Sequence, residues 1–230
     1  MAAIPRALER YPLGARLDGA LDAWRANDRD RGAPVTVTRV AFGPERRAER
    51  DDFVERVRAL FAVTAPALIT ALDAGAWDDD AFVVEEAVVE PAALPEGVAA
   101  LDARERALAA RSLAEGFARL HEAGWSIDAL APRDVVIDAY RQPRLSMALR
   151  VVPASEATRR DDVERLRTIV SSWTSVGEAA SADDLARSIR VPESASRPLL
   201  PTAAPPAASR LPWLLVALVV IAIVVVLATR

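Results

Sequence analysis

The sequence predicts an α+β fold that is followed by a single transmembrane helix. Within residues 8–190, apolar residues recur with the two-residue period of strands in some segments and with helical spacing in others. Residues 191–210 are rich in proline, alanine and serine without any period, which is typical of an extended linker. Residues 211–229 carry no charged side chain. We therefore expect a folded domain, a linker and a membrane helix over these three ranges.

The first half of the domain is predicted to be mostly β-structure with one helix. The helix is expected over 49–63, because Phe53, Val57 and Leu60 recur at helical spacing. The segment PVTVTRVAF, residues 34–42, alternates between apolar and polar residues and predicts a strand. Four further strands are expected at 10–17, 20–28, 67–77 and 81–88.

The second half of the domain is predicted to be mostly helical. Residues 102–124 form the longest expected helix, which ends with Gly124 at its C-cap. A later helix is expected to start at Asp161 or Asp162. The remaining predictions are helices at 161–173 and 181–190 and a hairpin of strands at 134–139 and 143–151.

The composition excludes several classes of site. There is no cysteine, which removes disulfides, thiolate metal sites and cysteine nucleophiles. All 29 Lys+Arg residues are arginine, so no lysine can form a Schiff base or hold a phosphate. The formal net charge of −4 gives no sign of nucleic-acid binding. The single histidine, His121, is expected to pack or cap at the end of the longest helix.

The uncharged segment 211–229 is predicted to span a membrane. At 1.5 Å per residue its length as a helix is about 28 Å, close to the hydrocarbon thickness of a bilayer. Trp213 lies where an interfacial aromatic residue is common, and arginines precede the segment on its N-terminal side. The N-terminus shows no signal-peptide pattern. We expect a single-pass protein of the cell membrane with its N-terminal domain in the cytoplasm.

Six segments of the domain resemble, in order and spacing, the corresponding segments of bacterial Ser/Thr protein kinases. They are RYPLGARL, WRANDRDRGAPVTVTRV, FVERVRAL, APALITALDAGAWDDDAFVVEEAV, LAEGFARLHEAG and DVVIDAYRQPRLS. The resemblance covers about residues 10–173 and implies a protein kinase-like two-lobed fold. Its C-terminal lobe would be truncated, because no Ala-Pro-Glu motif follows and the linker begins near residue 191.

The resemblance implies that the nucleotide-binding positions of this family are changed here. Thr38 matches the lysine that anchors phosphate, and Arg56 matches the helix glutamate that pairs with it. Glu85 matches the residue behind the adenine pocket, where a buried carboxylate without a partner is costly. Either Glu85 is paired, for which Arg56 is the hypothesis, or the strand is shifted. Alternation along the strand turns Arg39 away from the cleft.

The catalytic positions of the family are changed as well. Ala129 matches the catalytic base, Ala131 matches the phosphate-contacting lysine, and Asp134 matches the metal-binding asparagine. Asp134 is expected to cap or form a turn, since one carboxylate alone is a poor magnesium site. The Asp-Phe-Gly motif is matched by residues that begin at Met147, and the glycine-rich loop keeps only Gly19.

These departures predict a catalytically inactive, membrane-tethered pseudokinase that acts as a protein-binding or scaffolding module. We expect no cofactor, no metal and no ATP, and we expect the membrane and other proteins as partners. The alternative is a nucleotide-binding sensor, or an unconventional phosphoryl or nucleotidyl transferase, for which Asp134, Arg56 and Arg39 are the scattered candidates. A purely membrane-structural protein is a third interpretation.

Overall fold

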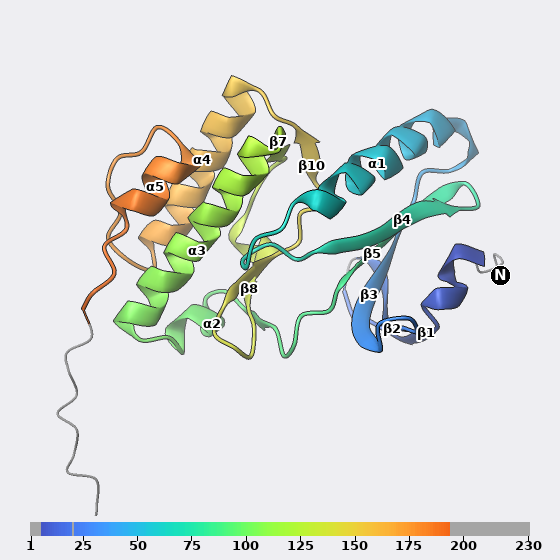
Figure 1. The fold of residues 1–230 in the computed structure, drawn as a ribbon, viewed down its shortest axis with the longest axis horizontal. Coiled ribbons are helices and arrows are strands. Elements are labelled where there is room, and N and C mark those ends of the chain that lie inside the picture. Colours follow the sequence, from blue (N-terminus) through green and yellow to red (C-terminus); the bar gives the residue numbers. More distant parts are fainter. Residues whose placement is uncertain (1–5, 20, 194–230) are drawn as a thin grey trace, which may run out of the picture. The chain divides into compact units, whose positions relative to one another are not determined.

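A five-stranded antiparallel sheet forms the first half of the described chain (Figure 1). The computed structural model describes residues 6–19 and 21–193. The strands lie in the order β1-β2-β3-β5-β4. The elements of this half are η1 (Arg6–Arg10), β1 (Leu13–Arg16), β2 (Asp22–Asp28), β3 (Ala33–Val40), η2 (Pro44–Arg46), α1 (Arg47–Ala59), η3 (Leu60–Ala62), β4 (Ala71–Trp77) and β5 (Asp80–Glu86).

Strand β5 is covered on both faces. All of residues 81–85 are buried, so the strand shows no alternation of buried and exposed positions. On one face, Phe53 and Val57 of α1 pack against alanine and valine side chains of β4 and β5. On the other face, Phe82 packs in a cluster with Tyr11 from the N-terminal segment. A run of apolar residues in this strand is therefore required by two separate packing interfaces.

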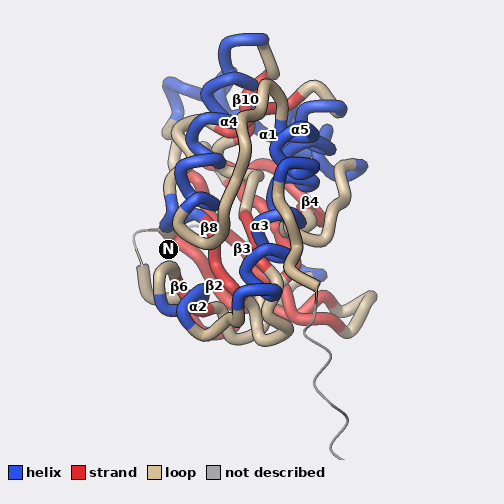
Figure 2. Tube along the Cα trace, turned by 90° about the vertical axis from the view of Figure 1, so that its left-hand side faces the viewer, coloured by secondary structure: helices blue, strands red, loops and turns tan. Residues whose placement is uncertain are grey.

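The second half combines three longer helices with two small antiparallel sheets. Figure 2 labels the helices α2, α3, α4 and α5 and the strands β6, β8 and β10 of this half. The sheets have the orders β6-β8-β9 and β10-β7. The elements are β6 (Ala92–Ala93), α2 (Glu96–Ala99), α3 (Ala103–Glu122), β7 (Trp125–Ile127), η4 (Pro132–Asp134), β8 (Val135–Ile137), β9 (Pro143–Leu145), β10 (Val151–Pro153), α4 (Glu156–Ser171) and α5 (Ala182–Ser188).

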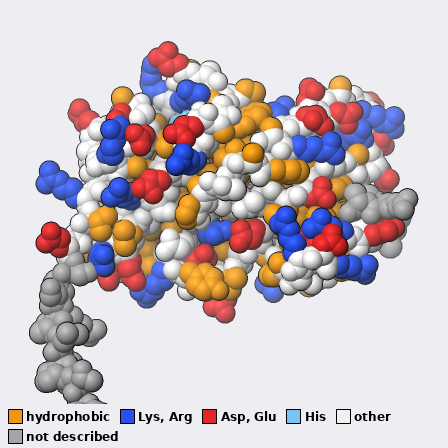
Figure 3. Space-filling model, viewed as in Figure 1, with side chains coloured by type: hydrophobic (Ala, Val, Ile, Leu, Met, Phe, Trp, Pro, Cys, Tyr) orange, Lys and Arg blue, Asp and Glu red, His pale blue; other side chains and the backbone are white. Residues whose placement is uncertain are grey.

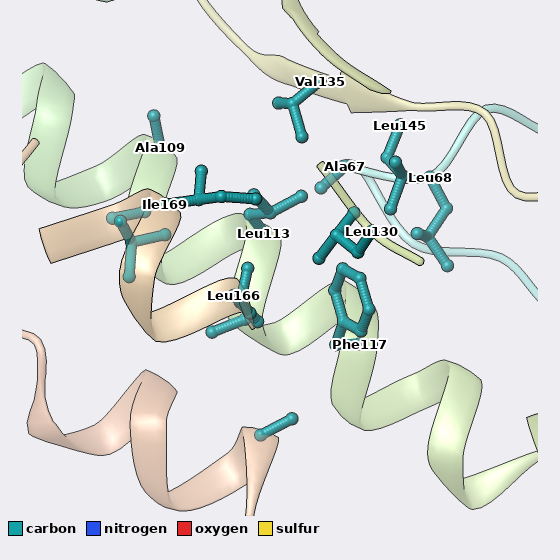
Figure 4. Close-up of a cluster of buried hydrophobic side chains, with 14 of the residues drawn as sticks. Ala67, Leu68, Ala109, Leu113, Phe117, Leu130, Val135, Leu145, Leu166 and Ile169 are labelled. Atoms are coloured by element: carbon teal, nitrogen blue, oxygen red, sulfur yellow. The ribbon is translucent and has the colours of Figure 1, made fainter. Parts of the chain in front are cut away.

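The core of the second half gathers on α3. Leu113 and Phe117 of this helix are fully buried and belong to the largest apolar cluster. Figure 4 shows Phe117 pointing toward Leu130, and Leu113 lying close to Leu166 of α4. Gly116 lies where α3 meets the loop before β4, and an added Cβ would come within 3.4 Å of Leu68. Close contact at this glycine holds the helix against the segment that enters β4.

The ends of the two long helices are set by local side chains. Asp102 caps α3 by accepting from the backbone N–H of Glu105 at 2.8 Å, and the chain leaves at Gly124 with φ 85°, as the sequence predicts. Helix α4 begins at Glu156, five residues before the predicted start at 161, because Ser155 caps it instead.

The predicted hairpin is only partly formed. Strand β9 pairs with β8, as expected for the hairpin, but it ends at Leu145. The chain then turns, and Val151–Pro153 pairs with β7 in a different sheet. The predicted strand 143–151 is therefore two short strands in two sheets.

The predicted fold class needs a correction. The structure supports an α+β domain, but it does not establish the more specific kinase-like fold with a transmembrane helix. In the part of the chain that is described, no helix combines the length and the apolar character needed to cross a membrane. The predicted span 211–229 lies outside the described residues. The α+β class is retained, and the membrane-anchored description is withdrawn.

Candidate functional site

A cavity of about 660 Å³ lies between the first sheet and the segments that surround β8 and β9. Strands β2, β3 and β5 contribute residues on one side, and Asp134, Val136, Arg144, Ser146 and Leu149 contribute on the other. Most of its wall is apolar, and Leu17, Val136 and Leu149 are among the aliphatic residues that line it. Its size falls in the range of roughly 300–1,000 Å³ that is usual for small-molecule sites.

Three of the predicted positions line this cavity together. Thr38 of β3 is 3% exposed, Glu85 of β5 is 6% exposed, and Asp134 ends the 3₁₀ turn before β8. The other four predicted positions do not line it. Met147 is fully buried in the main apolar cluster, Arg56 lies on α1, and Ala129 and Ala131 lie in the loop between β7 and η4.

Glu85 carries the most perturbed carboxyl group of the cavity. Burial raises the pKa of Glu85 to about 7, while hydrogen bonds from Ser146 and from the backbone of Ala148 act in the opposite direction. The Ser146 hydroxyl donates to the carboxylate and lies 2.9 and 3.0 Å from its two oxygens. Glu85 can therefore hold or release a proton near neutral pH inside an apolar cavity.

The predicted pair between Glu85 and Arg56 is wrong. The partner of Glu85 is Ser146, which lies 61 positions away in the sequence. Arg56 on α1 makes no ion pair in the described part of the chain, and its buried Nε has no hydrogen-bond partner there. The structural reason is that the segment after β9 runs directly beside β5 and delivers a hydroxyl group to the carboxylate.

Asp134 is held by a neighbouring arginine. Its Oδ2 accepts from the Arg150 guanidinium at 2.8 Å and from the backbone N–H of Ala131 at 2.8 Å. The same Arg150 nitrogen donates to the carbonyl oxygen of Ala129 at 3.0 Å. Ala129 itself has φ 53°, in the left-handed region that a non-glycine residue rarely adopts. Asp134 thus caps the 3₁₀ turn η4, and Arg150, which directly precedes β10, contacts that turn through Asp134 and Ala129.

Strand β3 presents its threonines to the cavity and its arginine to the opposite side. Thr36 and Thr38 both line the cavity, which is the alternation expected of a strand. Arg39 instead pairs with Asp80, with a shortest distance of 2.6 Å, and lies 5.2 Å from the centre of the Trp77 ring. The Arg39 side chain therefore lies on the face of the sheet opposite the cavity, as the strand pattern predicts.

His121 belongs to a separate buried cluster at the end of α3. Its Nε2 lies 2.9 Å from Oδ2 of Asp162, and the same oxygen accepts from the backbone N–H of Ile127 at 3.1 Å. Asp162 is fully buried, although the sequence pattern suggested a helix start at this position. The contacts join α3, α4 and β7, which gives His121 a structural role at the helix end.

Sequence reasoning missed Ser146, Arg150 and Asp162. Ser146 and Arg150 stand in a segment that was assigned to one continuous strand, so their side chains had no expected direction. The spacing of Ser155 and Thr158 was the signal that could have placed Asp162 in the second turn of α4 rather than at its start.

No family model matches the chain, and no curated protein matches it. The resemblance to protein kinases accordingly stays a prediction. Within residues 6–19 and 21–193, no group of three or more histidine, aspartate and glutamate side chains is placed to hold a metal ion.

Proposed function

We propose that this domain is a catalytically inactive protein-binding module, in the manner of a pseudokinase. The proposal rests on one observation, which is that Asp134 and Glu85 beside the cavity are already bound by other side chains of the domain. Asp134 is occupied by Arg150, and Glu85 is buried against Ser146 in a mostly apolar wall. A phosphoryl transferase instead needs cations and metal ligands directed at the transferred phosphate.

The charge of the cavity also supports a role without nucleotide phosphates. Among the side chains that line it are five carboxylates and only two guanidinium groups. One of the guanidinium groups, on Arg144, is already paired with Glu86 at 3.0 Å. A triphosphate in this cavity would meet more negative than positive charge, which disfavours its binding.

An exposed apolar site beside the cavity supports a protein partner. Val89 is 44% exposed and Tyr140 is 73% exposed. The backbone N–H of Ala139 donates to the carbonyl oxygen of Val89 at 3.0 Å, so the two exposed side chains stand on adjoining segments. An exposed tyrosine next to an aliphatic residue is the type of group that anchors protein interfaces. Figure 3 shows positive and negative side chains interspersed over the face in view, without a continuous basic area.

A thermal melt of the full chain tests the proposal against its nucleotide-binding alternative. The melt is recorded with and without millimolar ATP, alone and with Mg²⁺ or Mn²⁺. A ligand at 100 times its dissociation constant stabilises a protein by about 2.7 kcal/mol, which is a shift of several degrees for a domain of this size. We expect no shift. A clear metal-dependent shift would favour the nucleotide sensor or transferase instead.

The exposed apolar site is tested by crosslinking. A photo-crosslinking amino acid replaces Tyr140 in the full chain, and the matched control carries it at Phe61, which is 36% exposed on another part of the domain. We expect a discrete crosslinked protein from position 140 and none from position 61. Equal products at both positions would contradict a specific surface around Val89 and Tyr140.

A further inference from the structure

The cavity lined by Thr38, Glu85 and Asp134 has walls and charges that select one class of small ligand. We propose that it binds a small organic cation with a flat apolar body. This inference goes beyond the proposed protein-binding role, and it holds whether or not the domain has a protein partner.

The shape of the wall calls for an apolar body. Leu17 and Ala23 line the cavity from the first sheet and its first turn, while Val136 and Leu149 line it from the second half of the domain. A ring system placed between these aliphatic side chains removes apolar surface from water on both of its sides. Burial of this apolar surface favours binding.

The charge of the wall calls for a positive group on that body. Two of the five carboxylates are paired within the described residues, Glu86 with Arg144 and Asp134 with Arg150. The other three make no ion pair in the described part of the chain, and they are Asp18, Glu85 and Glu90. Of the two lining guanidinium groups only Arg25 is without such a pair there, and Arg25, Asp18 and Glu90 are all exposed while Glu85 is buried. The unpaired charge around the cavity is thus mainly negative, which is complementary to a cation.

The Glu85 carboxylate is the group that would contact the positive charge of the ligand. It is 6% exposed, and the Ser146 hydroxyl is its only side-chain donor in the described residues. A ligand ammonium or ring N–H⁺ would add a charge-assisted hydrogen bond to this buried carboxylate.

The proton on Glu85 gives the proposal a measurable signature. Because burial raises its pKa to about 7, the group is largely protonated at pH 6 and largely ionised at pH 8. A cation binds the ionised form, so its affinity should rise with pH through this window. The other charged residues that line the cavity with Glu85 are Asp18, Arg25, Glu86, Glu90, Asp134 and Arg144.

Three probes that share the acridine ring system separate the effect of ligand charge on binding from the effect of ligand shape. 9-Aminoacridine is a flat cation between pH 6 and 8, acridine is its neutral analogue, and acridine-9-carboxylate is its anionic analogue. Binding of each to the full chain is measured by fluorescence titration. We expect 9-aminoacridine to bind about tenfold more tightly than acridine at pH 8, since one favourable charge contact readily supplies that factor. The carboxylate should bind most weakly.

Two variants connect the effect to Glu85. Glu85→Gln removes the charge and keeps an acceptor for Ser146, while Glu55→Gln makes the same change on exposed Glu55 of α1, away from the cavity. We expect the first variant to lose about tenfold in affinity for 9-aminoacridine at pH 8, to lose the pH dependence, and to bind acridine as before. The Glu55→Gln variant should behave like the natural chain.

The outcomes are decisive in both directions. Selective binding of the cation that depends on Glu85 and on pH supports the proposal. Equal binding of the three probes, preference for the carboxylate, an unchanged Glu85→Gln variant, or no binding of any probe would each overturn it. Since the natural chain supplies the pH profile, the test remains decisive even if Glu85→Gln fails to fold.

Discussion

At the scale of single residues, the cavity shows that an ionisable group is defined by its surroundings more than by its type. Glu85 and Glu86 are neighbours on one strand, but one faces the cavity wall beside Ser146 and the other pairs with Arg144 at the surface. The pKa of Glu85 is raised to about 7 by burial, whereas its ordinary value is 4.5. This difference makes the stability of the domain depend on pH.

Glu85→Gln should stabilise the domain at pH 8 by about 2 kcal/mol and have little effect at pH 5. Between pH 4.5 and 7 the folded chain keeps a proton on Glu85 that the unfolded chain has lost. Stability from this group is therefore present below the unfolded pKa and is lost as pH rises through the folded pKa. Urea unfolding of both proteins at the two pH values measures the difference. The same difference in the free energy of unfolding between variant and natural chain at pH 5 and at pH 8 would contradict this prediction.

Arg150→Ala should destabilise the domain by about 1–3 kcal/mol, because Asp134 then keeps a mostly buried carboxylate without its charged partner. The control is Arg111→Ala, whose exposed pair with Glu115 contributes no more than about 0.5 kcal/mol. Chemical denaturation of the two variants compares them. A similar small loss in both would show that Arg150 does not hold the turn.

At the scale of elements, the domain depends on side chains that tie one helix or strand to the next. Asp162 of α4 reaches His121 of α3 and the backbone at Ile127 of β7 through one carboxylate oxygen. Its neighbour Asp161 is exposed and pairs only with Arg165 on the same helix. The two adjacent aspartates offer a direct comparison of an inter-element contact with a local one.

Asp162→Ala should cost about 3 kcal/mol, since it leaves a buried histidine and a buried N–H without their acceptor. Asp161→Ala should change the free energy of unfolding by no more than about 0.5 kcal/mol. Denaturant unfolding followed by circular dichroism gives both values. Equal losses would mean that Asp162 acts only within α4.

Helices and strands that are marked by a sequence period or by capping residues could be predicted from the sequence. The contacts between side chains of distant segments could not. The alternation in 34–42 gives β3, and the long helix agrees with its prediction because Asp102 and Gly124 mark its two ends. Helix α4 starts at Glu156 rather than at the predicted Asp161 or Asp162, because Ser155 is the residue that caps it. The partner of Glu85 was missed because its choice depends on how distant segments pack, which a sequence period does not encode.

At the scale of the whole molecule, the described residues carry their own core. Every buried apolar residue of the described part lies between Leu8 and Ile189, and all but Ala23 and Ile69 belong to three clusters. The chain divides into one unit over Met1–Pro192 and a second over Glu193–Arg230. The first unit should thus fold without the second.

Removal of residues 193–230 should leave the melting temperature of the domain within about 2 °C of that of the full chain, because no core residue of the first unit is lost. Differential scanning calorimetry of the two proteins makes the comparison. A loss of cooperativity or a much lower transition in the shortened chain would show that the first unit needs the remainder to fold.

The position of β5 has a consequence for how motion in this domain can be followed. The strand lies between β3 and β4 and is covered on both faces, so the backbone amides of Val83 and Val84 have hydrogen-bonded neighbours and no route to water in the folded state. Their hydrogen–deuterium exchange should require opening of the entire sheet. The exchange rates of these two amides would therefore report global unfolding of the domain. Faster exchange of backbone amides at the rim of the cavity would report local opening alone.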